Sequence, residues 1–170
     1  MEFERLLSAS GPTEGEVRRP SDSEHPSRIA WIQCVGSRDV TCNRDYCSGV
    51  CCMYATKEAI IAREHDAKIQ PTIFYNDIRA FGKGFEYYYE NAAANVGVRY
   101  VKGIVSTIKE EQSTLNLVVS YLGDDGGMTR ETFDMVVLSV GLEPAASTRR
   151  LAERCGVELK IGRASCRERV

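Results

Sequence analysis

The sequence contains no long hydrophobic run. Its apolar stretches fall well short of the ~20 residues that a membrane-spanning helix needs, and its first ten residues carry charges where a secretory signal would be apolar. We therefore expect no membrane span and a cytoplasmic location. Basic residues are not in excess either, since 22 Lys and Arg stand against 24 Asp and Glu, for a formal net charge of −2. Binding to a phosphate backbone needs a clustered positive excess, so we expect no nucleic-acid partner.

Several patterns of known chemistry are also absent. The only histidines, His25 and His65, fall in a polar arm and at the expected end of a helix, so we expect neither to be a ligand. The dinucleotide fingerprint G-x-G-x-x-G does not occur, and neither does the C-x2-C-x2-C-x3-C run of a ferredoxin module. No Ser-His-Asp set is evident, so we expect cofactors to carry any chemistry.

What the sequence does contain is an ordinary globular composition, with 43% hydrophobic residues, 14 Gly and 5 Pro in 170 residues, the size of roughly one domain. The first part alternates strand-like and helix-like segments, which predicts a parallel sheet covered by helices. Later strands separated by turns predict a β-meander. The expected fold is α/β, a three-layer Rossmann-like domain of the nucleotide-binding type. Strands are predicted at 29–35, 69–75, 98–101, 105–108, 115–122 and 132–140, and helices at 53–65 (starting near Cys51 or Cys52) and 85–95.

Cysteines are dense in one part of the chain. Within nineteen residues lie Cys34, Cys47, Cys51 and Cys52, with Cys42 between them. The first ends a predicted strand and the last two open a predicted helix, so a short loop can bring the four together. Thiolates in one pocket repel each other unless a cation is present, and thiolate ligands select zinc, copper(I) or iron–sulfur clusters. The pattern therefore predicts a metal centre.

The adjacent pair Cys51-Cys52 bears on the kind of centre. Structural zinc usually takes cysteines two to four residues apart, and adjacent ones chelate a single ion poorly. An iron–sulfur cube has four separate irons, so neighbouring cysteines can each take a corner. This favours a [4Fe–4S] cluster, with a structural zinc site in an interaction domain and a set of buried free thiols as alternatives. We expect Cys42 to be a spare loop thiol or a sensor residue, and Cys155 to pack.

The chain closely resembles the A subunit of heterodisulfide reductase over residues 1 to about 160. Four motifs, which occur in order, carry the resemblance: IQCVGSRD (32–39), YCSGVCCMYA (46–55), FYNDIRAFGKG (74–84) and VVLSVGLEP (136–144).

That family implies an oxidoreductase subunit with a thioredoxin-reductase-like flavoprotein core, FAD and an iron–sulfur cluster in the core domain. It implies that electrons pass between the FAD and the cluster to partner subunits, namely other heterodisulfide reductase subunits and a hydrogenase or dehydrogenase donor, in a homo- or hetero-oligomer. The implied cluster ligands are Cys34, Cys47, Cys51 and Cys52. Because the dinucleotide fingerprint and the ferredoxin run are missing, we expect an interior fragment with a partial FAD site, inactive alone. An NAD(P)H-binding domain of a disulfide reductase is the alternative.

By the same resemblance, Lys57 is the leading flavin contact, with a solvated helix lysine as the alternative. Backbone at Gly141, Leu142 and Pro144 is expected to approach the flavin, with a plain strand-ending turn as the alternative. The nearby loop with Asp77, Arg79 and Lys83 is equally consistent with a lid, an inter-subunit contact or a solvated loop.

The chain is thus expected to divide into four parts. These are a connecting arm (1–28), the Rossmann-like domain with its cysteine-rich insertion (29–145), the start of a returning FAD-domain segment (146–160) and an artefactual tail without periodicity (161–170).

Overall fold

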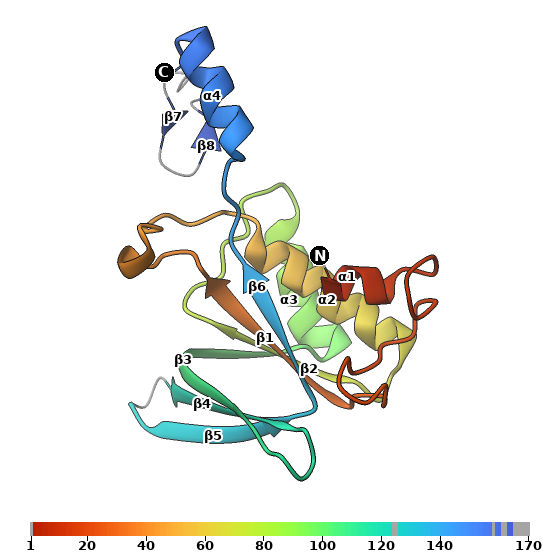
Figure 1. The fold of residues 1–170 in the computed structure, drawn as a ribbon. Helices are drawn as coiled ribbons and strands as arrows, with labels where there is room; N and C mark the ends of the chain where they lie inside the picture. Colours follow the sequence, from red (N-terminus) through yellow and green to blue (C-terminus); the bar gives the residue numbers. More distant parts are fainter. Residues whose placement is uncertain (1, 124–125, 158, 161–162, 165–170) are drawn as a thin grey trace.

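The computed structural model describes residues 2–123, 126–157, 159–160 and 163–164. Its main sheet has six strands in the order β5-β4-β3-β2-β1-β6 (Figure 1). These strands are β1 (Arg28–Val35), β2 (Gln70–Tyr75), β3 (Arg99–Glu110), β4 (Leu117–Gly123), β5 (Met128–Phe133) and β6 (Met135–Val140), and the short β7 (Leu159–Lys160) and β8 (Arg163–Ala164) pair with each other. The helical elements are α1 (Glu2–Leu7), η1 (Val40–Cys42), α2 (Cys51–His65), α3 (Phe85–Asn91), η2 (Ala92–Val96) and α4 (Ala146–Cys155).

The sheet has a parallel half and an antiparallel half. β1 pairs in parallel with β2 and β6, and β2 pairs in parallel with the start of β3. α2 lies in the connection from β1 to β2 and α3 in the connection from β2 to β3, as parallel neighbours require. The second half of β3 pairs antiparallel with β4, and β4 with β5. The predicted α/β fold, with a parallel sheet and a meander, is therefore confirmed.

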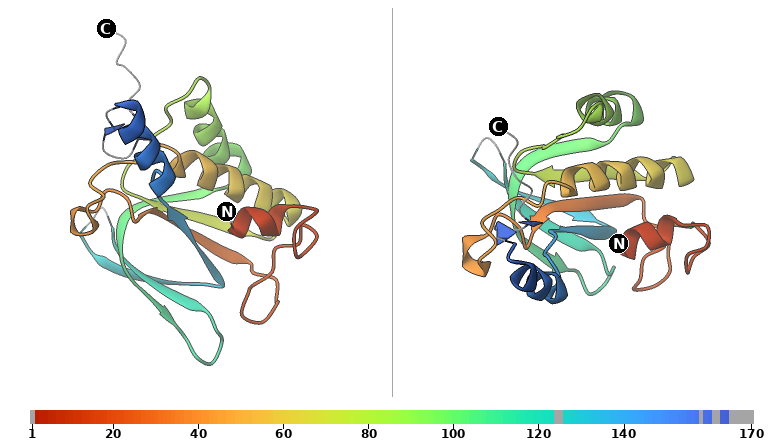
Figure 2. Two further views of the ribbon diagram at one scale, coloured as in Figure 1. Left: turned by 45° about the horizontal axis from the view of Figure 1, so that its top comes forward. Right: turned by 90° about the horizontal axis from the view of Figure 1, so that it is seen from above.

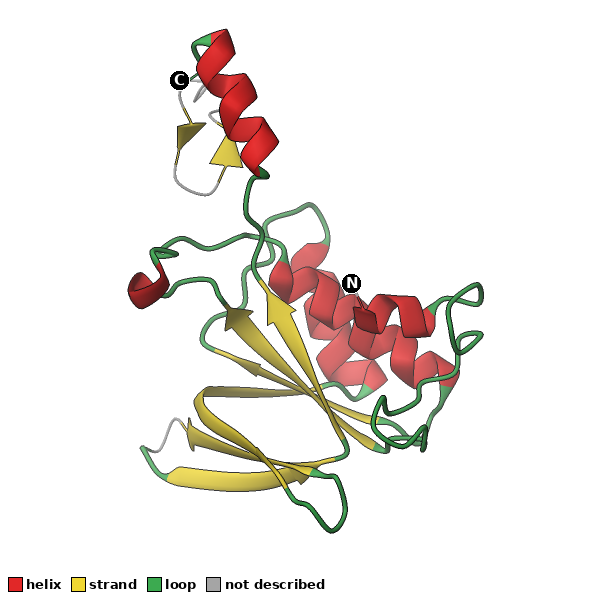
Figure 3. Cartoon of the chain, in the orientation of Figure 1, coloured by secondary structure: helices red, strands yellow, loops and turns green. Residues whose placement is uncertain are grey.

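Two separate cores lie on the two faces of the parallel strands. Successive strand residues face opposite sides, so Ile73 joins Trp31 in the core under the helices, and Phe74 joins the core under the meander. In the meander core, the ring centroids of Phe74 and Phe133 are 5.7 Å apart, and the two ring planes meet at an angle of 83°. Figure 2 and Figure 3 show the helices on one side of the parallel strands and the curled β3–β5 ribbon on the other, which makes three layers.

The start of the expected connecting arm contributes to the helix-side core. Phe3 and Leu7, on one side of α1, are buried, and so is Val17. The Phe3 ring meets Trp31 edge-on, with 5.2 Å between centroids. The segment 2–17 is therefore packed on the domain rather than detached from it.

Two predicted strand boundaries were wrong. The segments 98–101 and 105–108 form one strand, β3, because Gly103 is not a breaker: a Cβ there would lie 2.6 Å from the carbonyl oxygen of Leu122, so glycine permits close strand pairing. The segment 132–140 is split at Asp134. Its carboxylate accepts hydrogen bonds from the backbone N–H groups of Ser27 (2.7 Å) and Arg28 (2.8 Å), which fixes the passage from the meander to the parallel half.

The predicted helix 85–95 also differs in detail. Its regular part, α3, ends at Asn91, and a π-helical turn, η2, follows and ends at Gly97 with φ 82°. Pro71 lies second in β2, near the beginning of this interior strand, and is paired with Ile29.

Beyond β6 the chain leaves the sheet and forms α4, which projects from the domain (Figure 1). Cys155 at its end is exposed, so the expectation that it packs was wrong. Of the expected artefactual tail 161–170, only Arg163–Ala164 falls within the described residues. Across the described ranges, no helix has both the length and the apolar character to cross a bilayer.

Replacing Phe74 tests the meander core. Phe74 is 1% exposed, so Phe74→Ala should leave a cavity and lower the free energy of unfolding by about 3–5 kcal/mol, measured by urea denaturation followed by circular dichroism. The matched control is Phe81→Ala, at a side chain that is 72% exposed. It should change the free energy by less than about 0.5 kcal/mol. Equal effects of the two substitutions would contradict the layered arrangement.

The buried carboxyl of Glu58 should make the stability of the fold depend on pH. This carboxyl is 1% exposed, accepts a hydrogen bond from Trp31 Nε1 at 3.0 Å, and has its pKa raised by burial. Its contribution to stability is therefore fully present below the unfolded-state pKa of about 4.3, and is lost as pH rises through the folded-state pKa. Glu58→Gln keeps an acceptor without the charge.

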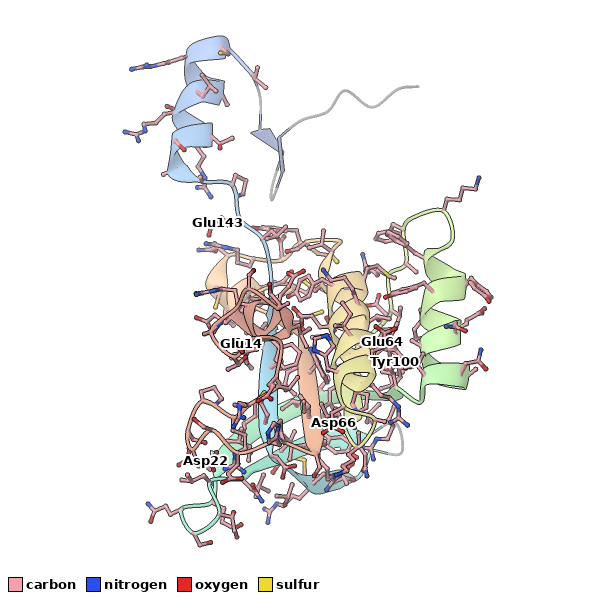
Figure 4. All side chains as sticks on the ribbon, turned by 90° about the vertical axis from the view of Figure 1, so that its right-hand side faces the viewer. Glu14, Asp22, Glu64, Asp66, Tyr100 and Glu143 are labelled. Carbon is pink, nitrogen blue, oxygen red and sulfur yellow. The ribbon has the colours of Figure 1, made fainter. Side chains whose placement is uncertain are left out.

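We expect Glu58→Gln to melt at a higher temperature than the wild-type protein at pH 7–8, with the difference shrinking as pH falls towards about 4. Thermal melts across this pH range measure it. Glu64→Gln, on the exposed side of the same helix, is the matched control and should show no such trend (Figure 4). A pH-independent difference for Glu58→Gln would show that its charge is not the cause.

Candidate metal centre

Cys34 lies at an irregularity near the end of β1. The pairing of β1 with β6 shifts register between Ile32 and Val35, and Cys34 has a φ of 62°, in the left-handed region. A bulge re-aims a side chain. Positive φ is uncommon outside glycine, and such strain often marks functional sites. The thiol of Cys34 is partly buried here.

Cys51 and Cys52 form the first turn of α2. Both are buried, and their sulfurs face the carbonyl oxygens of Val140 (3.6 Å) and Asp77 (3.8 Å) respectively. No side chain caps this helix end. The first backbone N–H groups of a helix lack partners within it and form the positive end of its dipole. The two cysteines therefore sit where an anionic group is favoured.

The four predicted ligands lie in one neighbourhood: Cys34, Cys47, Cys51 and Cys52. Burial is the largest effect raising the pKa of the Cys34, Cys51 and Cys52 thiols, and the charge of Cys47 raises each of them further. Cys52 also feels the charges of Cys34 and Cys51. Cys42 is exposed on η1 instead, where its thiol donates to a carboxylate of the same turn. The charges of the four cysteines therefore act on one another, whereas Cys42 is at the surface.

Within the part of the chain that the structure describes, no group of three or more His, Cys, Asp or Glu side chains is placed to hold a metal ion. Thiolates as ligands suit zinc, copper(I) or an iron–sulfur cluster. Gln33, which precedes Cys34 in β1, has a buried side-chain amide without a hydrogen-bond partner.

An ion-pair network borders the thiols. Arg38 pairs with Asp77, which also pairs with Arg79 at 3.1 Å between Nε and Oδ2. Partial burial raises the pKa of Asp77, but the two arginines outweigh it and hold the pKa below its usual value. Burial raises the pKa of the Cys34 thiol, and the positive charge of Arg38 acts in the opposite direction.

The sequence analysis missed Arg38. For Asp77 and Arg79 it left a lid, an interface between subunits and a solvated loop open, and the structure places both beside the thiols. Arg38 is only four residues from Cys34, but its role depends on Asp77, which is far away in the chain. No local pattern could have revealed it.

Tyr54 is a second residue that the sequence analysis did not single out. Its hydroxyl donates to the carbonyl oxygen of Val140 at 2.9 Å, the same oxygen that the Cys51 thiol faces. Burial raises the pKa of Tyr54 well above its usual value. The hydroxyl is therefore a neutral donor beside the thiol of Cys51.

The segment after β6 is attached to the cysteine loop. Leu142 donates its backbone N–H to Ser48 Oγ at 2.8 Å. A Cβ on Gly141 would lie 2.8 Å from the same oxygen and 2.9 Å from Cβ of Ser37, so glycine is needed for this approach. Pro144 follows on the partly exposed connection. The flavin role of Gly141, Leu142 and Pro144 stays a prediction, but the structure supplies an independent reason for the glycine.

Glu143 extends this attachment to α4. Its two carboxylate oxygens pair with Arg44 of the cysteine loop (2.7 Å) and Arg149 of α4 (2.8 Å). Figure 4 shows Glu143 at the point where the chain passes from the domain to α4. One carboxylate therefore joins the loop and the helix.

Lys57, the expected flavin contact, forms an ion pair with Glu4 of α1. Its side chain is 42% exposed. The pairing raises the pKa of Lys57, so the side chain is a cation at neutral pH. Its role at a flavin stays a prediction.

Comparisons with known proteins support the resemblance seen in the sequence. No protein-family model matches the chain. It is 50% identical, over 151 residues, to the iron-sulfur A subunit 2 of the CoB–CoM heterodisulfide reductase of Methanopyrus kandleri, covering 86% of this chain and 23% of that protein. It is 43% identical, over 163 residues, to the iron-sulfur A subunit of Methanocaldococcus jannaschii, covering 94% and 24%. The A subunit of the H2/formate:CoB-CoM heterodisulfide,ferredoxin reductase of Methanococcus maripaludis is 43% identical over 159 residues, covering 93% and 24%.

Solved structures are more distant. A thioredoxin reductase of T. acidophilum is 17% identical with a TM-score of 0.47, covering 79% of this chain and 36% of that one. LpdA of Mycobacterium tuberculosis is 17% identical with a TM-score of 0.38, covering 82% and 26%. These scores are too low to add to the fold assignment, which rests on the order of the strands in the sheet.

The chain spans about a quarter of the length of the curated relatives that it matches. Over that quarter, 43–50% of the residues are identical. The resemblance first inferred from the four sequence motifs is thereby confirmed: most of the chain is similar to one part of heterodisulfide reductase A subunits.

Proposed function

We propose that this chain is the part of a heterodisulfide reductase A subunit that holds a [4Fe–4S] cluster and passes electrons between FAD and partner subunits. The observation that carries the proposal is the gathering of four thiols where β1 ends and α2 begins. Like charges in a half-buried site repel each other, so these thiols would ionise together only around a cationic centre. The proposed ligands are Cys34, Cys47, Cys51 and Cys52.

The groups around the thiols support an anionic iron–sulfur centre. When bound, a [4Fe–4S] cluster supplies one-electron transfer. The uncapped end of α2 provides backbone N–H groups, and Arg38 provides a positive charge. Burial of Cys51 and Cys52 keeps water from part of the site. Hydrogen bonds, charge and solvent access are the means by which a protein sets a cluster's potential.

FAD is the second cofactor in this proposal. A cation near the isoalloxazine stabilises a reduced anionic flavin, and Lys57 follows Cys52 on the same helix. Backbone at Gly141, Leu142 and Pro144 completes the proposed flavin-facing set. The flavin site is partial because the sequence holds no dinucleotide fingerprint for the ADP half.

As one component of an oxidoreductase, the chain would work within an oligomeric complex. The relatives are named as subunits of heterodisulfide reductases, and that of Methanococcus maripaludis is named for H2 and formate. By analogy, the proposed partners are other heterodisulfide reductase subunits and a hydrogenase or dehydrogenase that supplies electrons.

Metal analysis tests the proposed centre. We expect the anaerobically purified protein to contain about four irons and about four acid-labile sulfides per chain, with an electron paramagnetic resonance (EPR) signal after reduction. Cys47→Ser should lose most of the signal or change its g values. Cys42→Ser is the matched control, a surface thiol of the same loop, and should keep iron, sulfide and signal unchanged. A colourless protein with one zinc per chain would refute the iron–sulfur proposal in favour of a zinc-stapled domain.

A pair of variants tests Lys57 at the flavin. Lys57→Ala removes the cation, whereas Glu4→Gln removes only its partner in the ion pair. Because a charged hydrogen bond contributes about 1.5–3 kcal/mol, Lys57→Ala should raise the FAD dissociation constant by a factor of about 10 to 150, measured by equilibrium ultrafiltration of the intact protein. Glu4→Gln should leave it unchanged. If the two variants have equal effects on FAD, Lys57 serves only to attach α1.

A further inference from the structure

Of the four proposed ligands, Cys47 alone lies outside regular secondary structure. Cys34 belongs to β1, and Cys51 and Cys52 belong to α2, whereas Cys47 lies in the loop that joins these two elements. The hydrogen bonds of a strand or a helix therefore do not fix its backbone, and loops are more mobile than the elements they connect. Contacts from outside the loop are needed to keep this thiol in one place.

Both chain neighbours of Cys47 make such a contact, and they make it with the same residue. Ser48 Oγ accepts a hydrogen bond from the backbone N–H of Leu142, just after β6, at 2.8 Å. On the other side of the cysteine, the Tyr46 hydroxyl lies 3.5 Å from the carbonyl oxygen of Leu142. The backbone of one residue thus contacts the chain on both sides of the thiol.

The same part of the chain also borders two other proposed ligands. The carbonyl oxygen of Val140 lies 3.6 Å from the Cys51 sulfur. The backbone N–H of Gly141 donates to the carbonyl oxygen of Val35, the residue after Cys34, at 3.0 Å. The end of β6 and the two residues after it therefore contact the chain at or next to three of the four thiols.

The closeness of this approach depends on Gly141. A Cβ at this position would lie 2.8 Å from Ser48 Oγ and 2.9 Å from Ser37 Cβ, distances at which one of the groups has to move. Gly141 does not have a positive φ. Alanine could therefore adopt its backbone conformation, and the effect of an added methyl group would come from its contact with the loop.

We propose that the segment 140–142 positions the Cys47 thiol for cluster binding by holding the loop on both sides of it. Its members are positioning residues, because they act through Tyr46 and Ser48. This inference rests on the proposed function, in which Cys47 is a cluster ligand. Loosening the loop should let the Cys47 thiol leave the centre more often, so that iron is lost faster.

The test measures the rate at which the intact, anaerobically purified protein releases iron to the chelator ferrozine. Ser48→Ala removes the acceptor of the Leu142 N–H. It should speed the release about two- to fivefold, which is the lower part of the range for one neutral hydrogen bond, because water can replace the acceptor at this exposed position. The matched control is Thr41→Ala, in the same loop, where the hydroxyl donates to Asp39 at 2.6 Å. It should release iron at the wild-type rate.

Gly141→Ala tests the close approach itself. The added methyl group should push the loop away, speed the release of iron at least about fivefold and change the g values of the EPR signal. In a Ser48→Ala background the same substitution should have a smaller effect, because the oxygen that the new Cβ would strike is gone. Equal factors in the two backgrounds would overturn the inference, since Gly141 would then act elsewhere in the fold.

Alkylation gives a second readout that needs no cluster. After the iron has been removed by chelation, iodoacetamide modifies the free thiols, and mass spectrometry of the peptides gives the rate at Cys47 relative to the exposed Cys155 of the same chain. Ser48→Ala and Gly141→Ala should raise this ratio by the same factors as they raise the rate of iron release. Thr41→Ala should leave it unchanged.

The two ways of failing are distinguishable. A wild-type protein with neither iron nor sulfide would refute the proposed function. If the wild type holds a cluster, and Ser48→Ala and Gly141→Ala keep wild-type rates of iron release and of Cys47 alkylation, only the positioning role is refuted. If circular dichroism shows that Gly141→Ala does not fold, Ser48→Ala decides, and wild-type rates in both assays would overturn the inference.

Discussion

The arrangement of this protein depends on mutual repulsion among four sulfurs that share a half-buried site. Ionising one thiol raises the free-energy cost of ionising the next, and burial adds to that cost for Cys34, Cys51 and Cys52. A positive environment lowers the free-energy cost of ionising several neighbouring thiols. The groups that border it are of the required kind, since the amino-terminal end of a helix and a guanidinium are both able to face negative charge.

The parallel half of the sheet explains why these groups meet. Three neighbouring strands, β2, β1 and β6, end at the same edge. The segment after β2 contributes Asp77, the end of β1 contributes Cys34, and the segment after β6 contributes Gly141. In open α/β sheets this carboxyl edge is where ligands commonly bind. The fold thus assembles the candidate site from residues more than a hundred positions apart in the chain.

The sequence was informative wherever the signal was local. Two elements could be predicted from patterns that lie within about twenty residues of sequence. The apolar run predicted β1, and the helical spacing of apolar residues predicted α2. The failures involved long-range contacts. Segments 98–101 and 105–108 were predicted as two strands, because the close pairing of Gly103 with Leu122 of another strand leaves no local signal. Asp134 divided a predicted strand through hydrogen bonds to residues at the start of β1. The ion pair of Arg38 with Asp77 depended in the same way on distant residues.

The single tryptophan has a practical consequence. Trp31 is fully buried at the centre of β1, with its indole N–H bonded to Glu58 and its ring against Phe3. Intrinsic indole fluorescence of this chain therefore has one source, and that source touches α1, α2 and the sheet together. Detachment of the amino-terminal helix alone would expose the ring to water and red-shift the emission, so an optical probe of that local opening is already built into the native sequence.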